Sequence, residues 1–307
     1  MSTLSGQFHE DRVADLVNLL DLERLDRDLY RGPVKPGASG RIFGGQVVAQ
    51  AFMAAERSIG DGDKIAHSLH AYFLRPGDET LPVILRVERD FDGGSFASRR
   101  VIAIQNGAPL LSLTASFQRL EEGLSHSAAM PAAPPPDSLP TLGDLADHYG
   151  ADWPETVQRY LRHPSAFEMR PVGAPSFLQR DKAEPQAMIW FRLRAPIPED
   201  AALRRAILAY VSDYALLSSA LIPHGISMFR TSMQTASLDH AVWFHDDAPL
   251  DQWLLYVTRS DWAGRGRGHA TGTIYSQDGR MIARTAQEGL MRLRPDRPAG
   301  GTIPHTP

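Results

Sequence analysis

The chain has 307 residues, which is enough for two domains of about 150 residues each. Its formal net charge of −4 argues against a nucleic-acid partner, because such partners require a basic footprint. The lack of cysteine excludes disulfides, thiolate metal sites and a cysteine nucleophile. No basic segment leads into an apolar run near Met1, and no apolar stretch approaches the ~18 residues of a membrane span, so we expect a cytoplasmic protein.

The first part of the chain has the pattern of helices followed by strands. Apolar residues at helical spacing predict a short amphipathic helix over 10–25. Gly44-Gly45 then opens an alanine-rich run, 46–57, which predicts a helix that is apolar on most sides and therefore buried. Strand-like runs bounded by turn residues follow at 67–74, 81–89, 95–105 and 108–118. The predicted first half is thus a long helix followed by an antiparallel meander.

A proline-rich stretch at 130–140 separates the two halves, because consecutive prolines favour an extended linker and do not fit a central strand. Residues 141–165 have a helical pattern that Trp153-Pro154 interrupts. The sequence therefore predicts an N-terminal domain at 1–122, a linker and connector at 123–165, and a C-terminal domain at 166–307.

The second half repeats the order of the first. Strand-like runs at 167–172 and 187–194 precede an apolar stretch, 199–220, that begins with Pro-Glu-Asp and predicts a second buried helix. Pro223-His-Gly225 ends this helix. The remaining strands are predicted at 234–244, 253–259, 268–276 and 280–292.

Two stretches of equal length, 94–107 and 266–279, show the repetition directly. Each starts at a glycine turn and closes on Asn106-Gly107 or Asp278-Gly279, dipeptides that favour a type I′ hairpin. We therefore predict an α+β fold of two like units, each a sheet wrapped around one helix. Joining the two sheets edge to edge would cover the exposed edge of each.

Familiar catalytic and cofactor motifs are missing. The stretch 93–97 does not have the spacing of a nucleophile elbow, and 264–268 lacks the third glycine of a dinucleotide fingerprint and leads into a strand. His67 and His70 lie three positions apart, and His240 and His245 lie five apart, so the members of each pair point to opposite faces of a strand and make a poor metal site. We expect neither a metal nor a cofactor.

Three polar residues interrupt apolar elements instead. Asp213 lies in the predicted helix 199–220, where a carboxylate is costly unless it is bonded or functional. Gln287 interrupts the last predicted strand, and Ser237 lies within the predicted strand 234–244. A capping role for Asp213 and structural roles for Ser237 and Gln287 are the ordinary alternatives.

With these residues in view, the chain is seen to resemble the acyl-CoA thioesterase II family. Members of that family carry two fused hotdog domains, and each domain is a long helix wrapped by an antiparallel sheet. The matching stretches occur in family order over nearly the whole chain: 43–51, 67–78, 95–107, 114–118, 130–137, 212–214, 223–225, 238–245 and 287–289. The resemblance implies a double hotdog fold and hydrolysis of acyl-CoA to fatty acid and coenzyme A.

By motif match the resemblance implies that Asp213, Ser237 and Gln287 hold the hydrolytic water, with His67 as a secondary candidate. Serine stands at a position that is threonine in well-known bacterial members, and it keeps the hydroxyl. Since the first half has Gln46 and Gln50 rather than an acid on its helix, we expect one working site per chain. Substrate contacts are expected from Gly44 and Gly45 at the helix start and, for the phosphates of coenzyme A, from Arg99, Arg100, Arg265 and Arg267.

Two other functions remain open at this point. A hotdog enoyl-CoA hydratase or dehydratase would need an Asp/His pair, for which Asp213 and His224 are the candidates. A non-catalytic acyl-CoA binding protein would bind without releasing thiol. The resemblance also implies a homo-oligomer, a dimer or a tetramer.

Overall fold

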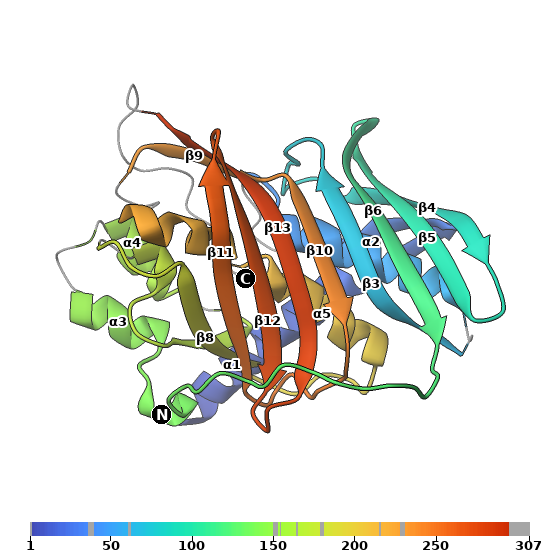
Figure 1. Cartoon of the computed structure of the whole chain (residues 1–307). Coiled ribbons are helices and arrows are strands. Elements are labelled where there is room, and N and C mark those ends of the chain that lie inside the picture. Colours follow the sequence, from blue (N-terminus) through green and yellow to red (C-terminus); the bar gives the residue numbers. More distant parts are fainter. Residues whose placement is uncertain are drawn as a thin grey trace.

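The computed structural model describes residues 2–35, 40–60, 63–149, 153, 155–163, 165–178, 181–214, 216–227 and 231–294. Within them, thirteen strands form one antiparallel sheet, and the helices α2 (Gly44–Ile59) and α5 (Ala201–Ser212) lie together on one face of it (Figure 1). The first half also contains α1 (Ser2–Leu20), β1 (Glu23–Asp26), β2 (Leu29–Gly32), β3 (Lys64–Phe73), β4 (Val83–Asp92), β5 (Phe96–Gln105) and β6 (Ala108–Arg119). The helix expected to reach residue 25 therefore ends at Leu20, and β1 follows it.

The connector contains η1 (Pro136–Ser138), α3 (Leu142–Tyr149) and α4 (Glu155–Leu161). The second half contains β7 (Phe167–Pro171), η3 (Ser176–Leu178), β8 (Gln186–Leu193), α5, η4 (Leu217–His224), β9 (Met233–Ser237), β10 (Asp239–Phe244), β11 (Leu254–Gly264), β12 (Arg267–Ser276) and β13 (Met281–Leu293). Most predicted elements are thus present, at slightly different bounds.

The strand order is a palindrome of equivalent elements: β1-β2-β4-β5-β6-β3 in the first half meets β10-β13-β12-β11-β8-β7 in the second. The halves join where β3 and β10 pair antiparallel, with Ala71 opposite His240 and Leu69 opposite Val242. The predicted edge-to-edge junction is confirmed. The α+β architecture of two hotdog units in one sheet is confirmed as well (Figure 1).

The two central helices run antiparallel in close contact. At one end a Cβ on Gly45 would lie 2.3 Å from the backbone oxygen of Tyr210, so only glycine permits this approach. At the other end Glu56 of α2 forms a 2.8 Å ion pair with Arg205 of α5. The start of α2 therefore lies at the end of α5, where the halves of the chain meet.

The hairpin turns follow the prediction in part. Asn106 (φ 48°) and Gly107 (φ 74°) form the expected type I′ turn between β5 and β6. In the turn between β12 and β13 only Gly279 has a positive φ, so the type I′ prediction was wrong there. Arg265 (φ 50°) and Gly266 (φ 73°) have left-handed backbone instead, between β11 and β12.

The helix expected over 199–220 is interrupted. α5 ends at Ser212, and Asp213 is its C-cap residue rather than an interior one. The N–H of Tyr214 bonds three residues back, so the backbone tightens to 3-10 spacing. The hydroxyl of Tyr256 donates to the Ser212 carbonyl at 2.9 Å and satisfies an acceptor that the helix end leaves open.

The strand expected over 234–244 is divided by a bulge at Leu238. The N–H of Leu238 donates to the Glu288 carbonyl of β13 at 2.9 Å, and its own carbonyl accepts the N–H of Phe73 in β3 at 2.9 Å. The carboxylate of Asp239 accepts the N–H of Glu288 at 2.7 Å, so a side chain replaces one ladder bond. Such bulges redirect neighbouring side chains.

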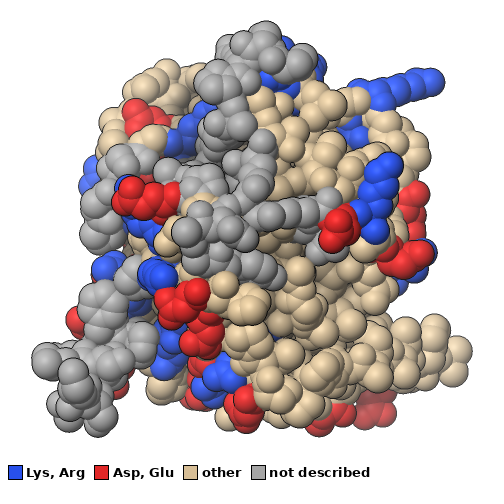
Figure 2. Space-filling view, turned by 90° about the vertical axis from the view of Figure 1, so that its left-hand side faces the viewer, with Lys and Arg blue, Asp and Glu red and all other residues tan. Residues whose placement is uncertain are grey.

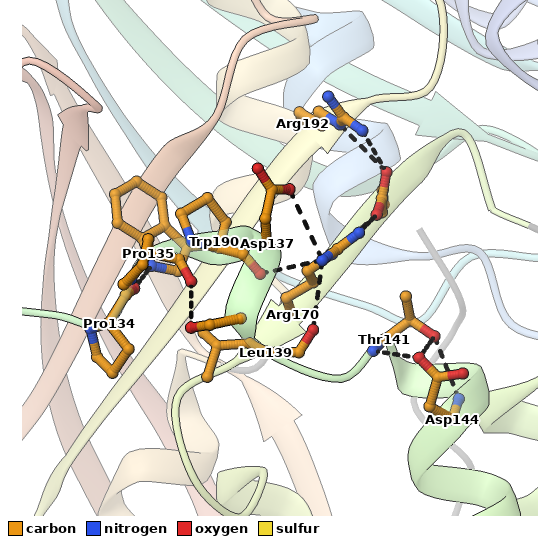
Figure 3. Close-up of polar contacts among 12 residues, drawn as sticks. Pro134, Pro135, Asp137, Leu139, Thr141, Asp144, Arg170, Trp190 and Arg192 are labelled. Carbon is orange, nitrogen blue, oxygen red and sulfur yellow. Dashed lines mark hydrogen bonds and ion pairs between the residues drawn. The ribbon is translucent and has the colours of Figure 1, made fainter.

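The linker runs beside β7 and β8, and side chains of these strands bond to it (Figure 3). The indole N–H of Trp190 donates to the Pro134 carbonyl at 2.9 Å, and the guanidinium of Arg170 donates to the Pro136 carbonyl at 3.0 Å. Arg170 also pairs with Glu168 of the same strand at 2.6 Å. These contacts fix the path of the connector that leads into α3 and α4.

Contrary to the expectation from the sequence, the segment Ala201–His224 is long and apolar enough to cross a membrane by length and composition alone. However, 88% of its most apolar window is buried inside the protein, as expected for the core of a globular fold.

On the face that Figure 2 shows, acidic and basic side chains are interspersed rather than gathered by sign.

Candidate active site

A cavity of about 440 Å³ opens between the start of α2 and the end of α5. Its wall is largely apolar, with Phe43, Val47, Phe73, Leu111, Phe177 and Leu217 among the lining residues. Asp213, Ser237 and Gln287 also line it, and they are the polar residues singled out in the sequence. The cavity is therefore largely apolar, with a small polar cluster where the two halves meet.

The three side chains are in direct contact. Gln287 donates from Nε2 to Asp213 Oδ1 at 2.5 Å, and its Nε2 lies 3.1 Å from Ser237 Oγ. Ser237 Oγ lies 3.3 Å from the same carboxylate oxygen. Separate elements supply the members: Asp213 follows α5, Ser237 ends β9 at the bulge, and Gln287 lies on β13, 1% exposed. The structure thus brings the three predicted side chains together in one hydrogen-bonded cluster.

The first half of the chain contributes the start of α2, which lies against this cluster. Asp213 Oδ2 lies so close to Gly44 that a Cβ there would stand 2.7 Å from it, and the N–H of Gly45 donates to the Asp213 carboxylate. Phe43, the N-cap residue of α2, provides no side-chain cap, and the N–H groups of Gln46 and Val47 bond to its backbone carbonyl. The positive end of the α2 dipole is thus directed at the carboxylate.

Burial dominates the electrostatics of Asp213. It raises the pKa of this carboxyl from 3.8 to about 6, against the lowering effect of the hydrogen bonds from Gln287, Gly45 and Ser237. A carboxyl with a pKa near 6 is largely ionised at neutral pH, yet it binds a proton far better than an exposed aspartate. These are the properties of a general base.

Two residues near the cluster were missed in the sequence. His240, fully buried on β10, lies behind Gln287, with Nδ1 at 3.3 Å from Gln287 Nε2. Tyr160, from α4 of the connector, lines the cavity and donates to the hydroxyl of Tyr214 at 2.7 Å. From the sequence, His240 was weighed only as a metal ligand. Tyr160 lies in a helix of the connector, and no sequence pattern indicates that such a helix forms a cavity wall.

None of the four arginines expected at the coenzyme A phosphates lines the cavity. Arg99 is 2% exposed and is held by Ser58 at 2.9 Å and Asp92 at 2.5 Å, so it is a buried structural residue. Arg100 pairs with Asp90 of β4, and Arg267 pairs with Glu288 of β13. Arg265 is exposed at the turn between β11 and β12. The cations that do line the cavity are Arg41 and Arg75, both exposed.

His67 does not join the cluster either. It lies at a register irregularity of β3, and its Nε2 is 2.8 Å from Ser116 Oγ of β6. Burial lowers its pKa. Because His67 is not among the residues that line the cavity, the geometry gives it no contact with a substrate bound there.

The pseudo-equivalent junction, at the other end of the two helices, has different chemistry. There the C-cap of α2 is Gly60, which has no side chain in the place of Asp213. The N-cap of α5 is Asp200, whose carboxylate accepts the N–H groups of Ala202 at 2.8 Å and Leu203 at 3.1 Å. Asp200 therefore satisfies the first N–H groups of α5, whereas Phe43, the N-cap residue of α2, has no side chain that can do so.

Fold and site together define a double hotdog protein with a polar cluster at one of its two helix junctions. Profiles of the acyl-CoA thioesterase N-terminal and C-terminal domains match residues 33–118 and 132–291. The chain belongs to the acyl-CoA thioesterase family, whose members are thioester hydrolases.

Named relatives agree with this assignment. The chain is 40% identical over 288 residues to human acyl-coenzyme A thioesterase 8, covering 91% of this chain and 89% of that one. It is 36% identical to acyl-CoA thioesterase 2 of Haemophilus influenzae, covering 92% and 99%. A crystal structure of acyl-CoA thioesterase II TesB2 from Mycobacterium marinum is 41% identical, with a TM-score of 0.74, and covers 92% and 100%.

Proposed function

We propose that this protein hydrolyses acyl-CoA through a water molecule that Asp213 activates and that Ser237 and Gln287 orient. The observation that carries the proposal is the convergence of these three side chains, from three separate elements, in one apolar cavity. The family assignment supports the substrate class.

In this mechanism the water oxygen attacks the thioester carbonyl carbon while its proton passes to Asp213. The raised pKa of Asp213 suits a base that must also return a proton. The carbonyl oxygen becomes an oxyanion, and the N–H of Gly44 at the positive start of α2 is the proposed donor to it. Breaking of the C–S bond releases coenzyme A thiolate, which takes the proton from Asp213. No covalent enzyme intermediate forms.

The remainder of the cavity is assigned by its chemistry. The acyl chain lies against the apolar wall that includes Phe73, Phe177 and Leu217. Arg41 and Arg75 at the mouth replace the four arginines of the sequence prediction as partners for the coenzyme A phosphates, since guanidinium groups pair well with phosphate oxygens.

The test is thiol release from acyl-CoA by Asp213→Asn, Ser237→Ala and Gln287→Ala. Asp213→Asn keeps the shape and removes the base, so kcat should fall by at least ~100-fold. Asp261→Asn, an equally conservative change at an exposed position on β11, serves as the control and should leave kcat unchanged. Turnover by Asp213→Asn within about threefold of wild type would reject the mechanism.

The same assay addresses the alternatives. A hydratase or dehydratase would convert the acyl group without free thiol, and its candidate His224 is exposed at the end of η4, outside the cavity lining. A non-catalytic binding protein would retain the ligand unchanged.

Light scattering on the purified protein tests the predicted dimer or tetramer.

A further inference from the structure

His240 is a buried histidine in contact with the catalytic cluster. It is 0% exposed, does not line the cavity, and bridges two groups: Nδ1 is 3.3 Å from Gln287 Nε2, and Nε2 is 2.8 Å from Ser212 Oγ. Ser212 in turn donates its hydroxyl hydrogen to the carbonyl of Ala209 at 3.0 Å. A continuous hydrogen-bonded row therefore leads from the last turn of α5 to Gln287.

One arrangement of hydrogens satisfies every bond in this row. Because Ser212 gives its only hydrogen to Ala209, Ser212 Oγ must accept from His240, so the proton of the neutral ring resides on Nε2. Nδ1 then has a free lone pair and accepts from the amide nitrogen of Gln287. The opposite amide orientation of Gln287 would place its carbonyl oxygen against this lone pair and against the carboxylate of Asp213.

We infer that His240 is a positioning residue that fixes the amide orientation of Gln287, so that the amide nitrogen rather than the oxygen faces Asp213 and Ser237. The inference rests on the proposed function, in which Gln287 orients the water. His240 itself touches neither substrate nor water. Its burial lowers its pKa to about 4, so the ring stays neutral and remains an acceptor throughout the working pH range.

The wild-type protein provides a direct test that does not depend on activity. In ¹⁵N-labelled protein at pH 7, long-range ¹H–¹⁵N spectra distinguish the two neutral imidazole tautomers, and the His240 signals are assigned by their loss in His240→Asn. The Nε2–H tautomer is expected. An Nδ1–H tautomer or a charged ring would overturn the inference, since Nδ1 would then be a donor facing another donor.

Two isosteric variants separate positioning from packing. Asparagine places an acceptor oxygen where Nδ1 is, whereas glutamine reaches the Nε2 position and leaves Gln287 without its acceptor. We expect His240→Asn to keep kcat within about fivefold and His240→Gln to lower it by about 10- to 100-fold with KM unchanged, because small displacements of a positioned group have effects of this size. The acid limb of the kcat/KM profile should also move to higher pH in His240→Gln, since the Gln287 hydrogen bond lowers the pKa of Asp213.

A double-mutant cycle links the effect to Gln287. In a Gln287→Ala background, His240→Gln should cause no further loss of kcat. Additive losses would show that the effect of His240 on kcat does not pass through Gln287 and would overturn the inference, while leaving the proposed function intact. If Asp213→Asn and Gln287→Ala retain turnover, the proposed function itself fails, which is a different result.

Discussion

The backbone N–H of Gly45, at the start of α2, donates a hydrogen bond to the carboxylate of Asp213, at the end of α5. The first residue belongs to the N-terminal half and the second to the C-terminal half. The site therefore exists only where the two halves meet, and the close approach depends on the absence of side chains at Gly44 and Gly45.

Alanine substitutions at these two glycines should separate catalysis from stability. A Cβ on Gly44 would stand 2.7 Å from Asp213 Oδ2 and 3.1 Å from the Phe73 ring, both side-chain atoms that can shift. Gly44→Ala should therefore fold and lose at least about tenfold in kcat, because 1 Å displacements of catalytic groups cost up to 100-fold. A Cβ on Gly45 would meet the backbone oxygen of Tyr210 at 2.3 Å, so Gly45→Ala should lower Tm by several degrees. Thiol release and thermal denaturation measure the two effects, and equal losses of Tm in both variants would contradict this division.

The pH dependence of kcat/KM should show an acid limb set by Asp213. The base works in its ionised form, and burial raises its pKa to about 6. Activity is therefore expected to be full above pH 7 and to fall about tenfold per unit as the pH drops below 6. Stopped-time assays of thiol release over pH 4.5–8 measure the limb. A profile flat down to about pH 5 would show that another group acts as base.

Stability should show the opposite preference. The folded-state pKa of Asp213 lies above its unfolded value of 3.8, so the folded protein holds a proton that the unfolded chain has released between about pH 4 and 6. This contribution is fully present below pH 4 and is lost as the pH rises through 6. Asp213→Asn does not titrate, so it should be more stable than wild type by about 1–3 kcal/mol at pH 8 and by less at pH 5. Chemical denaturation at the two pH values measures the difference; a gain independent of pH would indicate a different cause.

Neutralising the cations at the mouth should weaken binding of coenzyme A esters selectively. Arg41→Gln with Arg75→Gln is expected to raise KM for acyl-CoA by about tenfold or more, since charge-assisted bonds to phosphate are lost. The same acyl group on N-acetylcysteamine has no phosphate, and its KM should not change. Arg24→Gln with Arg86→Gln, an equal charge change on exposed strand residues, is the control. A matching rise for both substrates would show that the arginines act on the fold rather than on phosphate.

Much of the fold was accessible from the sequence because it depends on periodic patterns. The alanine-rich run after Gly44-Gly45, the alternating strands and the repeated turns predicted two units in one sheet, and β3 and β10 join them as expected. Asp213, Ser237 and Gln287 stood out as polar residues inside apolar elements, where they have an energetic cost, and the family resemblance grouped them as one predicted site.

The features that the sequence did not predict depend on single hydrogen bonds between residues far apart in the chain. The end of α5 is set by Tyr256 on a distant strand, and the bulge that presents Ser237 is held by Asp239. Arg99 looked like a surface cation at a turn, yet the sheet register buries it against Ser58. Such tertiary contacts carry no periodic signal, so helix breaks, bulges and the identity of the mouth arginines required the structure.

The unequal helix junctions have a consequence for how such proteins diverge. Two identical subunits related by a two-fold axis must present the same residues at both junctions. Within a single chain the two junctions can differ: Asp200 and the Glu56–Arg205 ion pair stabilise one junction, while the other has a helix start without a side-chain N-cap and a buried acid. Joining both units in one chain therefore permits one junction to serve stability while the other holds the polar cluster.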